Sequence, residues 1–285
     1  MTSNDPDLLY HYCSNMAFLS IVSTKTLWAS EFTLSNDHLE GKWLRRVVEA
    51  CCDDRKIAPH YKIQALEALD VVIGAMGAVG VCLSEEGDLL SQWRAYSENG
   101  SGVSIGFFRD RFGSSSALPS LQKIEYNLDR QKLLLAPKLE QAFEILESGT
   151  ATRPTLLTQA SDAAALKRYE DSYRKFMVSI FALFPFLFRF KNPAFQEERE
   201  WRSINYIPNS TEVSEFTLAG MDFRGLTDRI VPFQKYELDN NASKSAIAHV
   251  ILGPRNLTPS IVVEAALARH GWHNIKVTKS DASYR

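Results

Sequence analysis

The residues best suited to chemistry form one short stretch at 195–202, FQEEREWR. Alternate side chains of a β-strand share a face, so Glu198, Glu200 and Arg202 are predicted to project together. The two carboxylates would then stand roughly 6 to 7 Å apart. In a pair of acids at that spacing, one can act on a sugar while the other acts on an acceptor. The plainer interpretation is a solvated strand end, at which Arg199 and Arg202 neutralise the glutamates.

A second candidate is His11, which lies between Tyr10 and Tyr12 in an apolar stretch that leads into a helix. The stretch has the aromatic and aliphatic residues typical of a buried strand. A histidine that stands alone in such a strand is more often a core residue with a satisfied hydrogen bond than a ligand contact. On its own, His11 therefore indicates a site only weakly.

A third candidate region begins at 82–84 (CLS), the end of a predicted strand, and includes Ser84. Trp93 and Tyr96 follow it, three residues apart on a predicted helix. Residues at this spacing share a helix face, so the two rings can form a stacking wall for a planar ligand. Ordinary core packing explains the same pair equally well.

The elements that must position these residues are strands near both ends of the chain, with helices between them. Strands are predicted at 8–13, 27–30, 79–84, 102–108, 198–207, 229–233, 248–252 and 274–278. Helices are predicted after a cap at Ser14 or Asn15 and at 37–52, 61–73, 88–97 and 260–270. Residues 127–190 are almost entirely helical by pattern. We therefore expect an α+β fold, a single domain over 1–285 with a helical insertion at 127–190.

Composition narrows the functional classes. The formal net charge of −2 gives no basic excess for broad nucleic-acid binding. The apolar run 176–190 is shorter than the roughly 20 residues that span a bilayer, and it contains Pro185 and Arg189. It is therefore predicted to be a core helix ending near Pro185, and no membrane span is expected.

The four cysteines lack zinc spacing, so no metal site is expected. No export signal is visible, and we therefore expect reduced thiols and a cytoplasmic location.

Taken together, these stretches resemble known families. The order of a His11 strand, a Ser84 strand, an aromatic helix and a Glu198-x-Glu200 strand resembles the ADP-ribosyltransferase superfamily, and 9–12 (LYHY) is similar to the opening of its histidine-tyrosine-glutamate branch. The whole chain also resembles domain-of-unknown-function family 2971, a mostly bacterial family. That second resemblance rests on the stretches 9–12, 34–37, 82–84, 93–96, 198–202, 251–254 and 280–285.

The resemblance to transferases implies a split β-sheet core and NAD as the substrate. It implies that Glu200 stabilises the oxocarbenium-like ribose and that Glu198 faces the acceptor. It also implies a cofactor-binding set in which His11 bonds a ribose hydroxyl and an aromatic residue stacks on the nicotinamide ring. That set consists of His11, Tyr12, Ser84, and Trp93 or Tyr96. The acceptor, a protein or a nucleic acid, is left open, as is the oligomeric state, and the implied setting is a toxin, an effector or a defence protein.

Two other functions remain open. Cys82 stands where members of the histidine branch carry a first stacking tyrosine, which motivates a non-catalytic module that senses a nucleotide or binds a protein partner. The third hypothesis is nucleic-acid processing, for which the helical region and its approach supply scattered cations. These are Lys123, Arg130, Lys132, Lys138, Lys167, Arg168, Arg174 and Lys175. Such charges are more often a solvated face.

Overall fold

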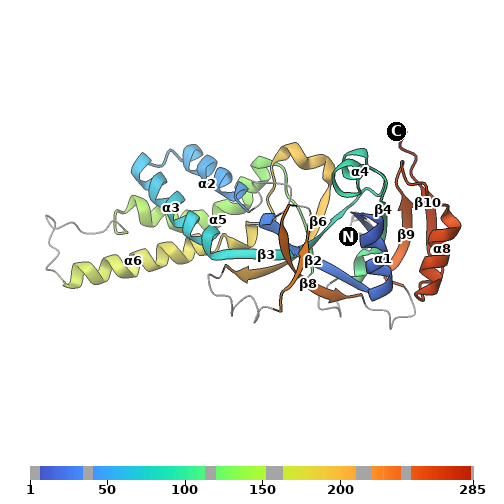
Figure 1. The fold of residues 1–285 in the computed structure, drawn as a ribbon. Coiled ribbons are helices and arrows are strands. Elements are labelled where there is room, and N and C mark those ends of the chain that lie inside the picture. The colour runs from blue at the N-terminus through green and yellow to red at the C-terminus, as the bar shows by residue number, and fades with distance from the viewer. Residues whose placement is uncertain are drawn as a thin grey trace.

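The computed structural model describes residues 7–34, 41–112, 120–151, 163–209, 220–226, 228–238 and 245–283. It is a mixed α/β structure built on a large mixed sheet, as Figure 1 shows. The strands are β1 (Leu8–Cys13), β2 (Thr26–Glu31), β3 (Met76–Ser84), β4 (Val103–Phe108), β5 (Leu121–Lys123), β6 (Glu200–Pro208), β7 (Asp222–Gly225), β8 (Ile230–Glu237), β9 (Ile247–Leu252) and β10 (Lys276–Lys279).

Helices gather at both ends of this sheet. In Figure 1, α2, α3, α5 and α6 form a group at one end, whereas α8 lies beside β10 at the other. The helices are α1 (Asn15–Thr24), α2 (Trp43–Asp54), α3 (Pro59–Ala75), α4 (Leu90–Tyr96), α5 (Leu128–Glu147), α6 (Ala163–Phe181) and α8 (Ser260–Arg269). Short 3-10 helices occur at Phe32–Leu34, Arg109–Arg111, Phe184–Phe186 and Pro193–Glu198.

Strand β3 is the branch point of the sheet. The strand order is β10-β9-β4-β1-β3-β2-β8-β7, and β6 pairs with the whole length of β3 and also with β5. A strand has two edges, so β1 and β2 must share the edge of β3 that β6 leaves free. β1 pairs with β3 only at Ser84, and β2 pairs with it at Val79 and Gly80. The two strands therefore diverge along β3.

A glycine makes this crossing possible. A Cβ atom on Gly80 would lie 2.2 Å from the carbonyl oxygen of Ser203 on β6 and 2.4 Å from the ring of Phe32. Neither contact is tolerable for a side chain at a point where three strands meet. Gly80 thus lets β2, β3 and β6 approach one another and brings Phe32 over the face of β3.

Two main hydrophobic clusters hold these parts together. The first packs α1 and α8 on the sheet and includes Leu9, Phe18, Val22, Ile105, Val250, Val263 and Leu267. The second lies under the helical group and includes Val47, Leu69, Phe143, Phe176, Phe188 and Ile204. Most of the apolar run at 176–190 is therefore core, with α6 ending at Phe181 ahead of Pro185. In the described part of the chain, no helix has both the length and the apolar character that crossing a bilayer requires.

Most of the predicted elements are present. β1 has the predicted bounds, Ser14 caps α1 by accepting a hydrogen bond from the amide of Ala17, and Phe18, Ile21 and Val22 of that helix are buried. Within the region expected to be helical, α5 and α6 are seen, while 152–162 lies outside the described residues, as does the predicted helix start at 37–40. Two short strands, β5 and β7, were not predicted.

Candidate functional site

A pocket of ≈ 100 Å³ opens where β1 and β2 diverge from each other along β3. Its walls come from β1, the 3-10 helix that follows β2, β3, α4, β6 and the segment that precedes β6. They consist of Tyr10, His11, Tyr12, Phe32, Cys82, Leu83, Ser84, Gln92, Tyr96, Lys191, Glu198, Glu200 and Arg202. The pocket therefore gathers His11, Tyr96 and both candidate carboxylates, which lie far apart in the sequence.

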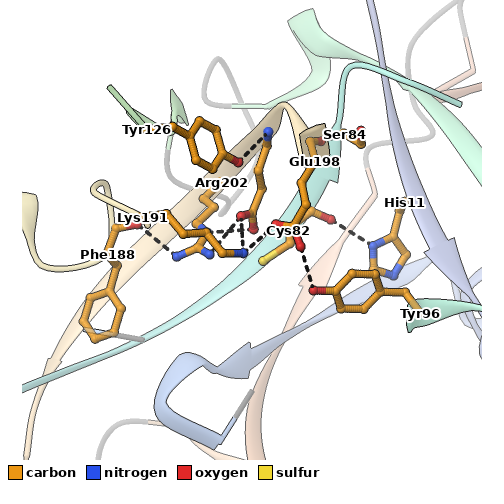
Figure 2. Close-up of polar contacts among 10 residues, drawn as sticks. His11, Cys82, Ser84, Tyr96, Tyr126, Phe188, Lys191, Glu198 and Arg202 are labelled. Carbon is orange, nitrogen blue, oxygen red and sulfur yellow. Dashed lines mark hydrogen bonds and ion pairs between the residues drawn. The ribbon is translucent and has the colours of Figure 1, made fainter. Parts of the chain in front are cut away.

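The two carboxylates converge by a route different from the predicted one. Glu198 is not on a strand, because it ends the 3-10 helix Pro193–Glu198, and β6 begins only at Glu200. Between them, Arg199 has the left-handed backbone angle φ 43°. This turn, rather than strand alternation, aims both carboxylates at one cation. The Nζ of Lys191 lies 2.5 Å from Oε2 of Glu198 and 3.1 Å from Oε2 of Glu200 (Figure 2).

Arg202 holds Glu200 from the other side. Its Nε donates to Oε1 of Glu200 at 2.7 Å and its Nη2 donates to Oε2 at 2.9 Å, while Nη1 donates to the carbonyl of Phe188 at 3.0 Å. The side chain of Arg202 is only 1% exposed. Two buried cations thus neutralise two buried carboxylates. The neutralisation predicted for Arg202 occurs, whereas Arg199 is exposed and pairs with Glu86.

Burial and these contacts together shift the pKa values of the two carboxyl groups in opposite directions. Burial raises the pKa of Glu200, but Arg202 and Lys191 outweigh burial and bring this pKa down to about 2. Burial also raises the pKa of Glu198, and there Lys191 compensates only in part, so the pKa of Glu198 stays above its usual value. Glu200 is therefore ionised at neutral pH, and Glu198 is the better proton acceptor.

His11 lines the pocket, and one of its two ring nitrogens, Nε2, can accept a hydrogen bond there. Its Nδ1 lies 3.1 Å from the carbonyl oxygen of Cys82, and a carbonyl can only accept, so Nδ1 carries the hydrogen. Burial lowers the pKa of His11, and the charge of Arg224 lowers it further, which keeps the ring neutral. Nε2 is then an acceptor, and among the described residues none bonds to it.

Tyr12 and Ser84 line the pocket, but their polar groups bind within the protein. The hydroxyl of Tyr12 donates to the carbonyl of Glu86 at 2.7 Å and accepts from the amide of Leu89 at 2.9 Å. The hydroxyl of Ser84 donates to the carbonyl of Glu198 at 2.7 Å and accepts from the amide of Glu86. Both side chains therefore fix the backbone beside the site.

Of the two aromatic residues predicted on α4, Tyr96 alone is among the pocket-lining residues. The residue is 41% exposed, and its hydroxyl lies 3.4 Å from Oε1 of Glu198. Trp93 has no exposed surface, packs edge-on against Tyr12 and donates its Nε1–H to Asp88 at 2.6 Å. Trp93 thus takes the core role, and Tyr96 is the ring available to a planar ligand.

Lys191 is the site residue that sequence reasoning missed. It precedes Glu198 and Glu200 by seven and nine positions, a spacing that fits neither a helix face nor a strand face. The one available signal was a lysine placed directly after a run of buried phenylalanines. Tyr126, whose hydroxyl accepts from the amide of Glu200 at 3.1 Å, was missed as well. In the part of the chain that is described, no three metal-ligating side chains cluster around a possible ion position.

Comparison with known families supports part of the resemblance. Residues 92–203 match the model of a family described as "Protein of unknown function (DUF2971)". The matched range contains Tyr96, Lys191, Glu198, Glu200 and Arg202, and His11 lies outside it. No curated protein and no solved structure matches the chain.

Proposed function

We propose that this chain is an NAD-dependent ADP-ribosyltransferase that transfers ADP-ribose to an acceptor on a protein or a nucleic acid. The observation that carries the proposal is the convergence of His11, Tyr96, Glu198 and Glu200 on one pocket. The divergence of β1 and β2 from each other along β3 supports a split-sheet core of the transferase type, since the pocket lies at this divergence.

The pocket would take the nicotinamide end of NAD. Small-molecule sites usually enclose roughly 300 to 1,000 Å³, and this pocket of ≈ 100 Å³ is too small for a whole dinucleotide. Tyr96, which is partly exposed, would stack on nicotinamide. The Nε2 of His11 would accept a hydrogen bond from a hydroxyl of the adjoining ribose. The phosphates and adenine would then lie outside the pocket.

The reaction divides between the two carboxylates. The bond between ribose C1′ and the nicotinamide nitrogen breaks, its electron pair leaves with nicotinamide as a neutral molecule, and positive charge develops on the ribose. The ionised carboxylate of Glu200 stabilises that charge. The acceptor then forms a bond to C1′ while its proton passes to Glu198, whose raised pKa suits a base. Lys191 holds the carboxylates together against their mutual repulsion.

The test is nicotinamide release from NAD, together with transfer of label from biotin-labelled NAD to protein and nucleic-acid acceptors. Glu200→Gln and Glu198→Gln should each lower turnover by roughly 100-fold or more, as the loss of a charge-stabilising group or a base does in other enzymes. Glu197→Gln is the matched control, because Glu197 is exposed and next to Glu198. A thermal melt of each variant checks that it folds. Equal turnover by the unmodified chain and Glu200→Gln with every acceptor would exclude the assignment.

A second function is favoured by a specific contact. Both oxygens of Glu200 already bond to Arg202, and one of them also bonds to Lys191, so this carboxylate is fully engaged within the protein. Together with Cys82 at the expected stacking position, this favours a non-catalytic module that senses a nucleotide or binds a protein partner. NAD would then raise the melting temperature without releasing nicotinamide. Measured side by side, the two readouts separate the two functions.

A further inference from the structure

Arg224 on β7 is a partly buried cation. Its Nη2 donates to the hydroxyl of Ser30 at 2.9 Å, while its Nε is buried and has no hydrogen-bond partner among the described residues. Burial is the one cause that shifts its pKa, which falls below the usual value. Within the described ranges no carboxylate pairs with it, whereas nearby Lys235 pairs with Asp222 at 2.5 Å. A partly buried charge without a partner is unfavourable, so an anion that binds beside Arg224 would be stabilised by it.

The strand registers place Arg224 on the same face of the sheet as the pocket. Asp222 and Ser30 are both partners of Phe233 on β8, and Arg224 lies two residues beyond Asp222 on the same side of β7. Ser30 is also the partner of Gly80 on β3. Pocket residue Cys82 lies two positions beyond Gly80 and so shares this face.

The side chain of Arg224 reaches toward the pocket. It crosses β8 to bond Ser30 on β2, the strand that borders the divergence. It also lies close enough to His11 for its charge to lower the pKa of the imidazole. Beside it, Trp28 stacks on Phe233 with ring centroids 4.3 Å apart, and Trp28 is partly exposed. A cation and a flat aromatic surface therefore continue the site beyond His11.

We propose that Arg224 is the phosphate-binding residue of an anion subsite on the face of β2, β8 and β7 that carries Ser30 and Trp28, next to His11. A guanidinium presents donors in a fork that matches two phosphate oxygens, and among the described residues no carboxylate neutralises the charge of Arg224. The ligand is a phosphate group. Its assignment to the diphosphate of NAD rests on the proposed function, whereas anion binding itself does not. The small pocket requires the diphosphate to lie outside, and Arg224 is a cation close to His11 that is not itself one of the pocket-lining residues.

The experiment measures binding by isothermal titration calorimetry to the full chain with four probes: NAD, ADP-ribose, pyrophosphate and nicotinamide. Arg224→Gln should weaken binding of the three phosphate-bearing probes by roughly 10-fold or more, since hydrogen bonds to charged groups are worth about 1.5 to 3 kcal/mol. It should leave nicotinamide binding unchanged. Arg224→Lys should recover part of the loss. Lys235→Gln is the matched control, because it removes a cation from the same face that is already paired with Asp222.

The outcomes separate this proposal from the proposed function. If NAD binds through Arg224 without turnover, the subsite stands and the transferase assignment fails. Equal affinity of Arg224→Gln and the unmodified chain for all phosphate-bearing probes overturns the subsite, even if nicotinamide is released. Binding of pyrophosphate alone, lost in Arg224→Gln, supports a subsite for free phosphate anions and argues against NAD. If the unmodified chain binds none of these anions, the subsite is overturned.

Discussion

Arg202 and Glu200 form a two-point ion pair inside the protein, with Nε to Oε1 at 2.7 Å and Nη2 to Oε2 at 2.9 Å. Glu200 and Arg202 are two positions apart on β6, so their side chains lie on the same face of the strand. This alignment also fixes the plane of the carboxylate. Burial strengthens the attraction and also makes either partner costly to leave alone. The pair therefore sets both the orientation and the stability of the site.

Arg202→Gln should destabilise the fold. The substitution leaves Glu200 buried without its main partner, and breaking a buried pair in this way costs about 3 to 5 kcal/mol. The free energy of unfolding, measured in urea at neutral pH, reports the loss. Arg199→Gln is the control, since that exposed arginine pairs with Glu86 at the surface and should change the free energy of unfolding by less than about 1 kcal/mol. Similar losses in the two variants would show that the Arg202 pair does not stabilise the fold.

Acid should remove the stabilisation that comes from Glu200. Its pKa in the folded protein is about 2, below the value of 4.5 for a free carboxyl, so its contribution is complete above pH 4.5 and is lost as the pH falls towards 2. The loss is on the order of 3 kcal/mol. Urea unfolding between pH 6 and pH 2 measures it. The Glu200→Gln variant should lack this part of the pH dependence, and an unchanged slope in that variant would assign the acid sensitivity to other carboxyls.

Lys191→Met should make stability fall as the pH rises. Without Lys191, Glu198 and Glu200 repel each other, and the already raised pKa of Glu198 moves further up. A carboxyl with a raised pKa in the folded state stabilises at low pH and loses that contribution as the pH rises through this pKa. The variant should therefore lose about 3 to 5 kcal/mol at pH 7.5 and less at pH 5, as measured by urea unfolding. Lys123→Met, at an exposed lysine paired with Glu85, should show no such difference between the two pH values.

Tyr96→Ala should mainly change ligand affinity, whereas Trp93→Ala should mainly change stability. Tyr96→Ala removes the ring of a pocket-lining residue that is 41% exposed, so it should lower NAD affinity while barely changing the melting temperature. Trp93→Ala removes a fully buried ring and should cost about 3 to 5 kcal/mol of stability. Calorimetric NAD binding and a thermal melt of each variant make the comparison. A melting temperature that falls equally in both variants would mean that Tyr96 is part of the core.

Elements with local signals could be predicted from the sequence. Ser14 caps a helix whose apolar residues recur at helical spacing, and these signals lie within ten residues of one another. At the C-terminal end, the predicted order of strand, helix and strand matches β9, α8 and β10, with Gly271 in the positive-φ conformation just after the helix. Such elements depend on nearest-neighbour chemistry, which the sequence displays directly.

Features that depend on distant contacts could not be predicted. A left-handed backbone conformation such as that of Arg199 is uncommon for a residue other than glycine, so the sequence offered no reason to begin the strand only after it. Lys191 approaches the two carboxylates only because the chain turns through the 3-10 helix Pro193–Glu198. The sharing of β3 by β1, β2 and β6 is likewise a tertiary arrangement with no local pattern.

Because β3 is shared, one residue sets the alignment of the whole site. Cys82 gives its carbonyl to His11, and in the strand register it is the partner of Arg202, which holds Glu200. The imidazole of His11 and the carboxylate of Glu200 are thus both positioned through Cys82 on β3, so neither group can shift alone. An insertion of one residue before Cys82 would shift the register of β3 by one position and turn its side chains to the opposite face of the sheet. The shift would displace His11 and Glu200 from the pocket together.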